Sequence, residues 1–175
     1  EMEKWHGLVS RAQNLPEVVR AMATAGLHKV VDFQDCAYGS LYLDRLAQVL
    51  KDDTAERNYE LGTVAAKYIA NAMAYDDIIR VADLKTRATR TARIDAEMGK
   101  TDAHVLQLTE YFHPRAEEIA GLLPAALGAR TQANPARMAR LAKWFGKGRR
   151  LRTDSLRAFM MLHILGGLKG YRLRT

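Results

Sequence analysis

The sequence feature that most constrains the fold is a long series of apolar residues at helical spacing, with no proline between it and Pro114. The series advances in alternating steps of four and three residues and consists of Leu61, Ala65, Tyr68, Ala72, Tyr75, Ile79 and Ala82. This spacing places all of its members on one face of an α-helix. Beyond Ala82 the pattern loses its phase, which predicts a bend or a new packing partner around residues 85–93. We therefore expect an all-α fold, a helical bundle with a long central helical hairpin.

Local signals predict further helices before and after this series. The segment 14–17 (NLPE) has the spacing of a helix start, and Gly26 is typical of a helix end. Asn134–Pro135 is a second combination of cap and proline, so another helix should begin there. A last helix, capped by Thr153 or Asp154, has the apolar centre AFMMLHIL, which predicts burial on nearly all sides.

The rest of the chain leaves room for at most one short strand pair. Residues 104–112 (HVLQLTEYF) favour an extended conformation, and residues 146–153 (GKGRRLRT) predict a basic loop or a short strand. With 48% hydrophobic and 27% charged residues, the composition is that of a folded chain. Its 175 residues fit one domain, so we expect residues 1–175 to form a single helical domain.

Several classes of protein are excluded by the cysteines, histidines and apolar runs. Cys36 is the sole cysteine, which rules out an internal disulfide and suits the cytoplasm. No histidine stands at metal-ligand spacing from Cys36 or from another histidine, so we predict no metal site. We expect His163 to be buried in the last helix. The apolar run at 158–168 is too short to cross a bilayer, and no secretory leader opens the chain. We expect a cytoplasmic protein without a membrane partner.

Adjacent carboxylates at Asp76 and Asp77 are the nearest approach to a catalytic pair. Neighbouring helical positions point about 100° apart, so the two carboxylates do not converge on one atom. We interpret them as ion-pair partners, one of them for Arg80, and we interpret Asp83 and Arg87 as a second pair. Since no nucleophile stands beside a base, we predict no catalytic residue, and a free-standing enzyme has the least support.

The positive charge is concentrated towards the C-terminus. From residue 130 onward there are 12 Lys and Arg against one acidic residue. Guanidinium groups bind phosphates and carboxylates bidentately, so such clusters suit an anion, coenzyme A or an acidic partner. We select one cluster for this role, consisting of Arg149, Arg150, Arg152 and Lys169. We interpret a second set, repeating every three residues, as an interface ridge made of Arg87, Arg90 and Arg93. Aromatic residues are not interleaved with these arginines, which argues against nucleic acid.

Four longer segments carry a resemblance to a known family. They are residues 31–46 (VDFQDCAYGSLYLDRL), 74–94 (AYDDIIRVADLKTRATRTARI), 109–128 (TEYFHPRAEEIAGLLPAALG) and 148–162 (GRRLRTDSLRAFMML). Together they resemble the C-terminal helical domain of the indolepyruvate ferredoxin oxidoreductase β-subunit family. In that family an α/β domain of the pyruvate:ferredoxin oxidoreductase γ type comes first, so the resemblance implies that this chain is a fragment that follows such a domain.

The resemblance implies a place in a complex that oxidatively decarboxylates a 2-oxo acid to an acyl-coenzyme A and passes the electrons to ferredoxin. Thiamine diphosphate, magnesium and the iron–sulfur clusters are then expected on the partner α subunit, with no cofactor in this fragment beyond a contact with coenzyme A. The fragment itself would be an accessory domain that contacts the α subunit and its own α/β domain. The alternative is a stand-alone helical module that binds nucleic acid or an anionic ligand.

Overall fold

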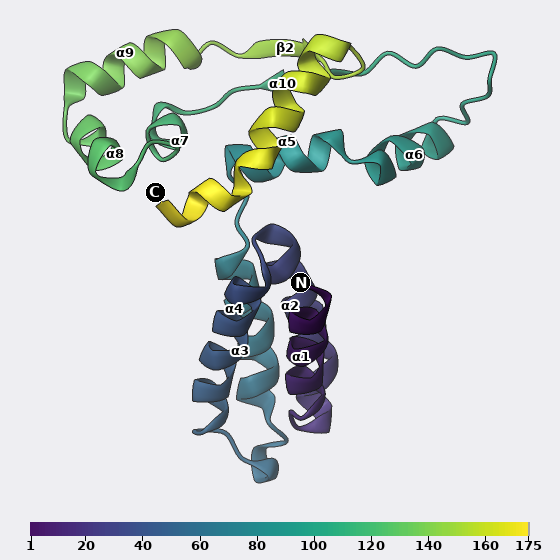
Figure 1. Cartoon of the computed structure of the whole chain (residues 1–175), viewed down its shortest axis with the longest axis vertical. Coiled ribbons are helices and arrows are strands. Elements are labelled where there is room, and N and C mark those ends of the chain that lie inside the picture. Colours follow the sequence, from purple (N-terminus) through teal and green to yellow (C-terminus); the bar gives the residue numbers. More distant parts are fainter. Residues whose placement is uncertain (175) are drawn as a thin grey trace. The chain divides into compact units, whose positions relative to one another are not determined.

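The computed structural model describes residues 1–174, with the side chains at positions 149, 173 and 174 excepted. Contacts between residues group the chain into two compact units, here called unit 1 (Glu1–Tyr75) and unit 2 (from Asp76 onward). Figure 1 shows the elements of both units in the order of the chain. Compact contact groups need not unfold separately, so the single helical domain of residues 1–175 stays a prediction.

Unit 1 is a bundle of α-helices (Figure 1). Helix α2 packs against α4, α3 and α1, and the bundle is closed by contacts of α3 with α4 and α1. A helix at the very start of the chain was not predicted, and Asn14 ends this helix instead of capping the next one. The elements are α1 (Met2–Gln13), α2 (Glu17–Phe33), α3 (Cys36–Leu50), the 3-10 turn η1 (Ala55–Arg57) and α4 (Glu60–Met73).

The prediction that Gly26 ends a helix is wrong, because α2 continues through it to Phe33. Gly26 instead leaves room for the buried ring of Tyr42 on α3. A Cβ at position 26 would lie 2.3 Å from the hydroxyl oxygen of Tyr42. That hydroxyl donates a hydrogen bond of 2.9 Å to the carbonyl of Ala66 on α4. The missing side chain therefore lets one tyrosine link three helices inside the core.

The face of α4 that enters the core differs from the predicted apolar face. Tyr68 of the predicted series is 61% exposed, and Leu61 and Tyr75 are also exposed. The buried face consists of Gly62, Ala66, Ala70 and Met73. Small side chains let the backbones of packed helices come close, and a Cβ at Gly62 would lie 2.3 Å from Leu50. Periodicity does not register this close approach at Gly62, Ala66 and Ala70, so the predicted face was displaced from the buried one.

The long central helical hairpin predicted from this series is also wrong, because the helix breaks at residues 74–77. Helix α4 ends at Met73, and α5 (Ile78–Thr86) begins after the N-cap Asp77. The backbone of Asp77 is extended, and its carboxylate accepts a hydrogen bond of 2.6 Å from the backbone N–H of Arg80. The predicted bend within residues 85–93 is confirmed, since the extended backbone of Arg87 separates α5 from α6 (Ala88–Glu97).

Unit 2 combines short helices with one strand pair. Strands β1 (Thr109–Phe112) and β2 (Arg149–Arg152) pair antiparallel, with Tyr111 opposite Arg150. The all-α fold class with at most one short strand pair is thereby confirmed for the described residues. Asn134 and Pro135 begin α9 as predicted, because the Asn134 side chain caps the helix at the backbone N–H of Arg137. The remaining elements are α7 (Ala116–Ala120), α8 (Ala125–Gln132), α9 (Pro135–Phe145), α10 (Leu156–Gly166) and the 3-10 segment η2 (Gly167–Arg174).

Helix α10 crosses and packs against α5, as Figure 1 shows, but it is not buried on all sides as predicted. Leu156 is 75% and Ile164 63% exposed, and His163 is exposed and stacked on the ring of Phe159. The prediction of a buried His163 is therefore wrong. The predicted caps Thr153 and Asp154 are wrong as well, because the hydroxyl of Ser155 caps the helix. Within the described part of the chain, no helix combines the length and apolar character needed to cross a bilayer.

Candidate functional site

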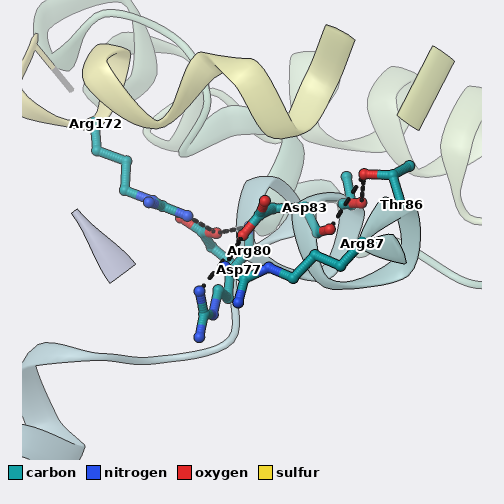
Figure 2. Close-up of polar contacts among 7 residues, drawn as sticks. Asp77, Arg80, Asp83, Thr86, Arg87 and Arg172 are labelled. Carbon is teal, nitrogen blue, oxygen red and sulfur yellow. Dashed lines mark hydrogen bonds and ion pairs between the residues drawn. The ribbon is translucent and has the colours of Figure 1, made fainter. Parts of the chain in front are cut away.

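The candidate site lies in unit 2 and is organised by carboxylates that each bind more than one partner. Asp77, the N-cap of α5, also binds the guanidinium of Arg172 at 2.5 and 2.8 Å. Figure 2 shows Arg172 reaching from η2 to this carboxylate. On the next turns of α5, the carboxylate of Asp83 contacts Arg87 at 2.5 Å and Arg80 at 3.5 Å. The predicted pair of Asp83 with Arg87 is confirmed, whereas the partner Arg172 was not foreseen.

A second shared carboxylate belongs to Glu110 on strand β1. One oxygen of Glu110 forms an ion pair with the Lys85 ammonium, and the other lies 2.6 Å from the Arg90 guanidinium. The hydroxyl of Thr153 approaches the same carboxylate at 3.4 Å. The Lys85 ammonium also lies 5.2 Å from the centre of the Phe112 ring. Desolvation, followed by the positive charge of Arg90, lowers the pKa of Lys85.

These cations line a pocket of about 630 Å³ between α5 and α6. Its walls include Val81 and Leu84, and its basic residues are Lys85, Arg87, Arg90 and Arg93. The structure therefore brings together Arg87, Arg90 and Arg93, the three members of the predicted ridge. They border a hollow, and Arg93 pairs with Glu97 at 3.5 Å. Their predicted role as an interface stays a prediction.

A second pocket, of about 390 Å³, is lined by residues of α5, α7, α9, α10 and the strand pair, and its lining is mainly apolar. It shares Asp76, Val81 and Lys85 with the cationic pocket. Its apolar wall is formed by Ile78, Tyr111, Phe112, Pro114, Ile119, Phe145, Leu151, Met161, Leu162 and Leu165, and its other polar residues are Asp77, His113 and Glu118. A cationic and an apolar hollow thus adjoin one another at Val81 and Lys85.

The other predicted anion cluster is less concentrated. Arg150 lies over the ring of Tyr111, with 5.3 Å between the guanidinium carbon and the ring centre. Arg152 binds Asp154 at 2.6 Å, and this pairing raises the pKa of Arg152 and lowers that of Asp154. Lys169 lies exposed on η2, in a different element from the strand that carries these arginines. The side chain of Arg149 lies outside the described residues.

Metal and thiol chemistry find little support in the described side chains. No group of three or more histidine, cysteine, aspartate or glutamate residues there is placed to hold a metal ion. Cys36 begins α3, and burial together with the Glu1 carboxylate raises the pKa of its thiol. A raised pKa keeps the thiol protonated and poorly nucleophilic at neutral pH.

Comparison with known proteins identifies a family. Residues 19–175 match a family described as a family of unknown function (DUF6537). The chain belongs to this family. No curated protein and no solved structure was found to match. Membership in DUF6537 names no reaction, so the resemblance to an oxidoreductase β subunit stays a prediction.

Sequence reasoning missed two of the central residues of this DUF6537 site, Lys85 and Glu110. Lys85 stands two residues before the arginine repeat, and this proximity could have identified it as a further member of the basic run. Glu110 is a different case, because it reaches Lys85 and Arg90 only through the pairing of β1 with β2 and the packing around α5. No local pattern in the sequence indicates that long-range contact.

Proposed function

We propose that this DUF6537 chain is a non-catalytic accessory domain of an indolepyruvate or other aryl 2-oxoacid ferredoxin oxidoreductase β subunit. The resemblance of the four sequence segments supports the choice of enzyme. In this proposal the α subunit carries thiamine diphosphate, magnesium and the iron–sulfur clusters, and ferredoxin acts on the whole cytoplasmic complex. A single cysteine could not by itself ligate a cubane cluster, which agrees with that division.

The observation that best supports a docking role is an exposed apolar stripe on α10. Leu156, Met160 and Ile164 follow one another at intervals of four residues, so they lie on one face of the helix. All three are substantially exposed. Contiguous exposed apolar surface is typical of protein interaction sites. The excess of Lys and Arg in this part of the chain favours an acidic contact surface, here assigned to the α/β domain or the α subunit.

The docking proposal is tested by capture of the separately expressed α subunit and α/β domain on the immobilised chain. We expect salt-sensitive capture of at least one of them. The double variant Met160→Glu, Ile164→Glu should lose it, because two carboxylates would be desolvated in the interface. Val105→Glu, at an exposed loop position, is the matched control and should bind normally. Unchanged capture by the double variant would refute the role of α10, and no capture by the parent chain would refute docking.

A contact with coenzyme A is a separate part of the proposal and concerns Arg149, Arg150, Arg152 and Lys169. Arg150 and Arg152 are exposed on one strand and suit the phosphates of this cosubstrate. Calorimetric titration of coenzyme A should show binding by the parent chain and its loss after Arg150→Ala and Arg152→Ala are combined. If affinity and subunit assembly are both unchanged in that variant, this assignment is wrong.

The alternative, a stand-alone module that binds an anionic ligand, is favoured by the cationic pocket beside α5. It differs from the docking role in needing no partner protein, and a purified chain is sufficient to test it. Nucleic acid is less well suited, because several of the arginines already bind carboxylates of the chain. If the chain shifts the electrophoretic mobility of random DNA, and this binding weakens steeply with salt, nucleic acid would be preferred over a small anionic ligand.

A further inference from the structure

We propose that unit 2 binds a small amphiphilic anion, with its phosphate or carboxylate head among Lys85, Arg87 and Arg90 and its aliphatic body in the apolar pocket. The inference does not depend on the proposed oxidoreductase role. It concerns residues of α5, α6, α10 and the strand pair, all of which belong to unit 2. Both hollows have volumes within the range of about 300–1,000 Å³ that is usual for small-molecule sites.

The charge around Glu110 supports an anionic head group. Lys85 and Arg90 share this single carboxylate, so two positive charges face one negative charge. The three side chains are largely buried, which limits screening by water. Glu110 holds both cations in place before any ligand arrives, and such preorganisation reduces the entropy lost on binding. An incoming anion would compensate the remaining positive charge.

The adjoining apolar pocket supports an aliphatic body. Val81 and Lys85 are four residues apart on α5 and border both hollows, so a ligand that binds beside Lys85 is next to the apolar wall. Met161, Leu162 and Leu165 of α10 form much of that wall. Apolar lining with a few polar groups is the usual composition of a small-molecule site. Asp76 borders both hollows too and disfavours an anion placed directly beside it, and Asp77 and Glu118 are the other acidic residues of the apolar pocket's lining.

The two parts of the site make different demands on a ligand, and octyl phosphate satisfies both. Calorimetric titration of the purified chain with octyl phosphate, below its micelle concentration, should show saturable binding. Octanol lacks the head and inorganic phosphate lacks the body, so each should bind about tenfold or more weakly than octyl phosphate. Octanoate distinguishes the two head groups: tighter binding of octyl phosphate assigns a phosphate, and tighter binding of octanoate assigns a carboxylate.

Variants locate the binding site within unit 2. Arg90→Gln removes one of the two cations on Glu110 while Lys85 and Thr153 still contact that carboxylate, and it should weaken binding about tenfold. For the body, Met161 and Met160 form a matched pair, because they are 48% and 46% exposed but only Met161 lines the pocket. Met161→Ala should weaken octyl phosphate binding severalfold, and Met160→Ala should leave it unchanged.

Four outcomes would overturn the inference. Equal affinities for octyl phosphate and octanol would show that no anion site contributes. Equal affinities for octyl phosphate and inorganic phosphate would show that the apolar pocket is not used. Equal losses in Met160→Ala and Met161→Ala, or none in Arg90→Gln, would place the ligand elsewhere on the surface. Failure to capture the oxidoreductase partners would leave all of these affinities unaffected, so the two proposals fail independently.

Discussion

Replacing Gly26 by alanine should destabilise unit 1, although alanine is the better helix former. Gly26 lies in the middle of α2, where an alanine Cβ would be 2.3 Å from the hydroxyl oxygen and 2.8 Å from the ring carbon Cζ of Tyr42. It would also lie 3.0 Å from the Cβ of Ala70 on α4. The Tyr42 ring is fully buried, so it cannot move aside without disturbing the core.

Three contributions set the size of the expected effect. Overpacking a close-packed core costs about 1–3 kcal/mol. Displacement of the hydrogen bond from Tyr42 to the Ala66 carbonyl adds about 1 kcal/mol. The higher helix propensity of alanine offsets about 1 kcal/mol of this cost. The free energy of unfolding of unit 1 should therefore fall by about 1–3 kcal/mol.

The assay is urea unfolding of a Trp144→Phe background, in which Trp5 reports unit 1 through its contact with the His28 ring at 4.6 Å. Gly7→Ala is the matched control, because a Cβ at that helical position would have no atom within 4 Å beyond its chain neighbours and the backbone of its own helix. It should stabilise the unit by about 0.5–1 kcal/mol. If Gly26→Ala is as stable as the parent or gains stability as Gly7→Ala should, the packing argument is refuted.

Two further predictions concern ion pairing and pH. Arg172→Gln should cost about 1–3 kcal/mol in urea unfolding, because the Arg172 side chain is 8% exposed and binds Asp77 through two hydrogen bonds. The ion pair of Arg93 with Glu97 is about two-thirds exposed, so Arg93→Gln should lower the free energy of unfolding by less than about 0.5 kcal/mol. Equal losses in Arg172→Gln and Arg93→Gln would contradict this reasoning. Burial raises the pKa of Tyr42 to about 12, above its ordinary value of 10.0, so the folded state favours the neutral phenol. The stabilisation by the neutral Tyr42 phenol should be complete below pH 10 and be lost as the pH rises to about 12. The free energy of urea unfolding should therefore fall over this pH range in the parent chain and fall less in Tyr42→Phe.

The accuracy of the sequence predictions followed the range of the interactions involved. The N-cap Asn134 and the ion pair of Asp83 with Arg87 depend on neighbouring residues, and the structure confirms them. The burial of α4 and α10 was predicted wrongly, because it depends on which neighbouring helix approaches and how closely. On α4, the small residues Gly62 and Ala66 admit that approach, and Leu61, Val64 and Tyr68 remain exposed.

The sequence alone determined the helical character of the chain, its limit of at most one short strand pair and the grouping of Arg87, Arg90 and Arg93. These properties follow from backbone preferences and from spacing over a few residues. Only the tertiary structure decided that Glu110 binds Lys85 and Arg90 and that the apolar pocket adjoins the cationic one. Such contacts join residues far apart in the chain, and their geometry is set by the packing of α5 against α10 and the strand pair, which no local pattern encodes.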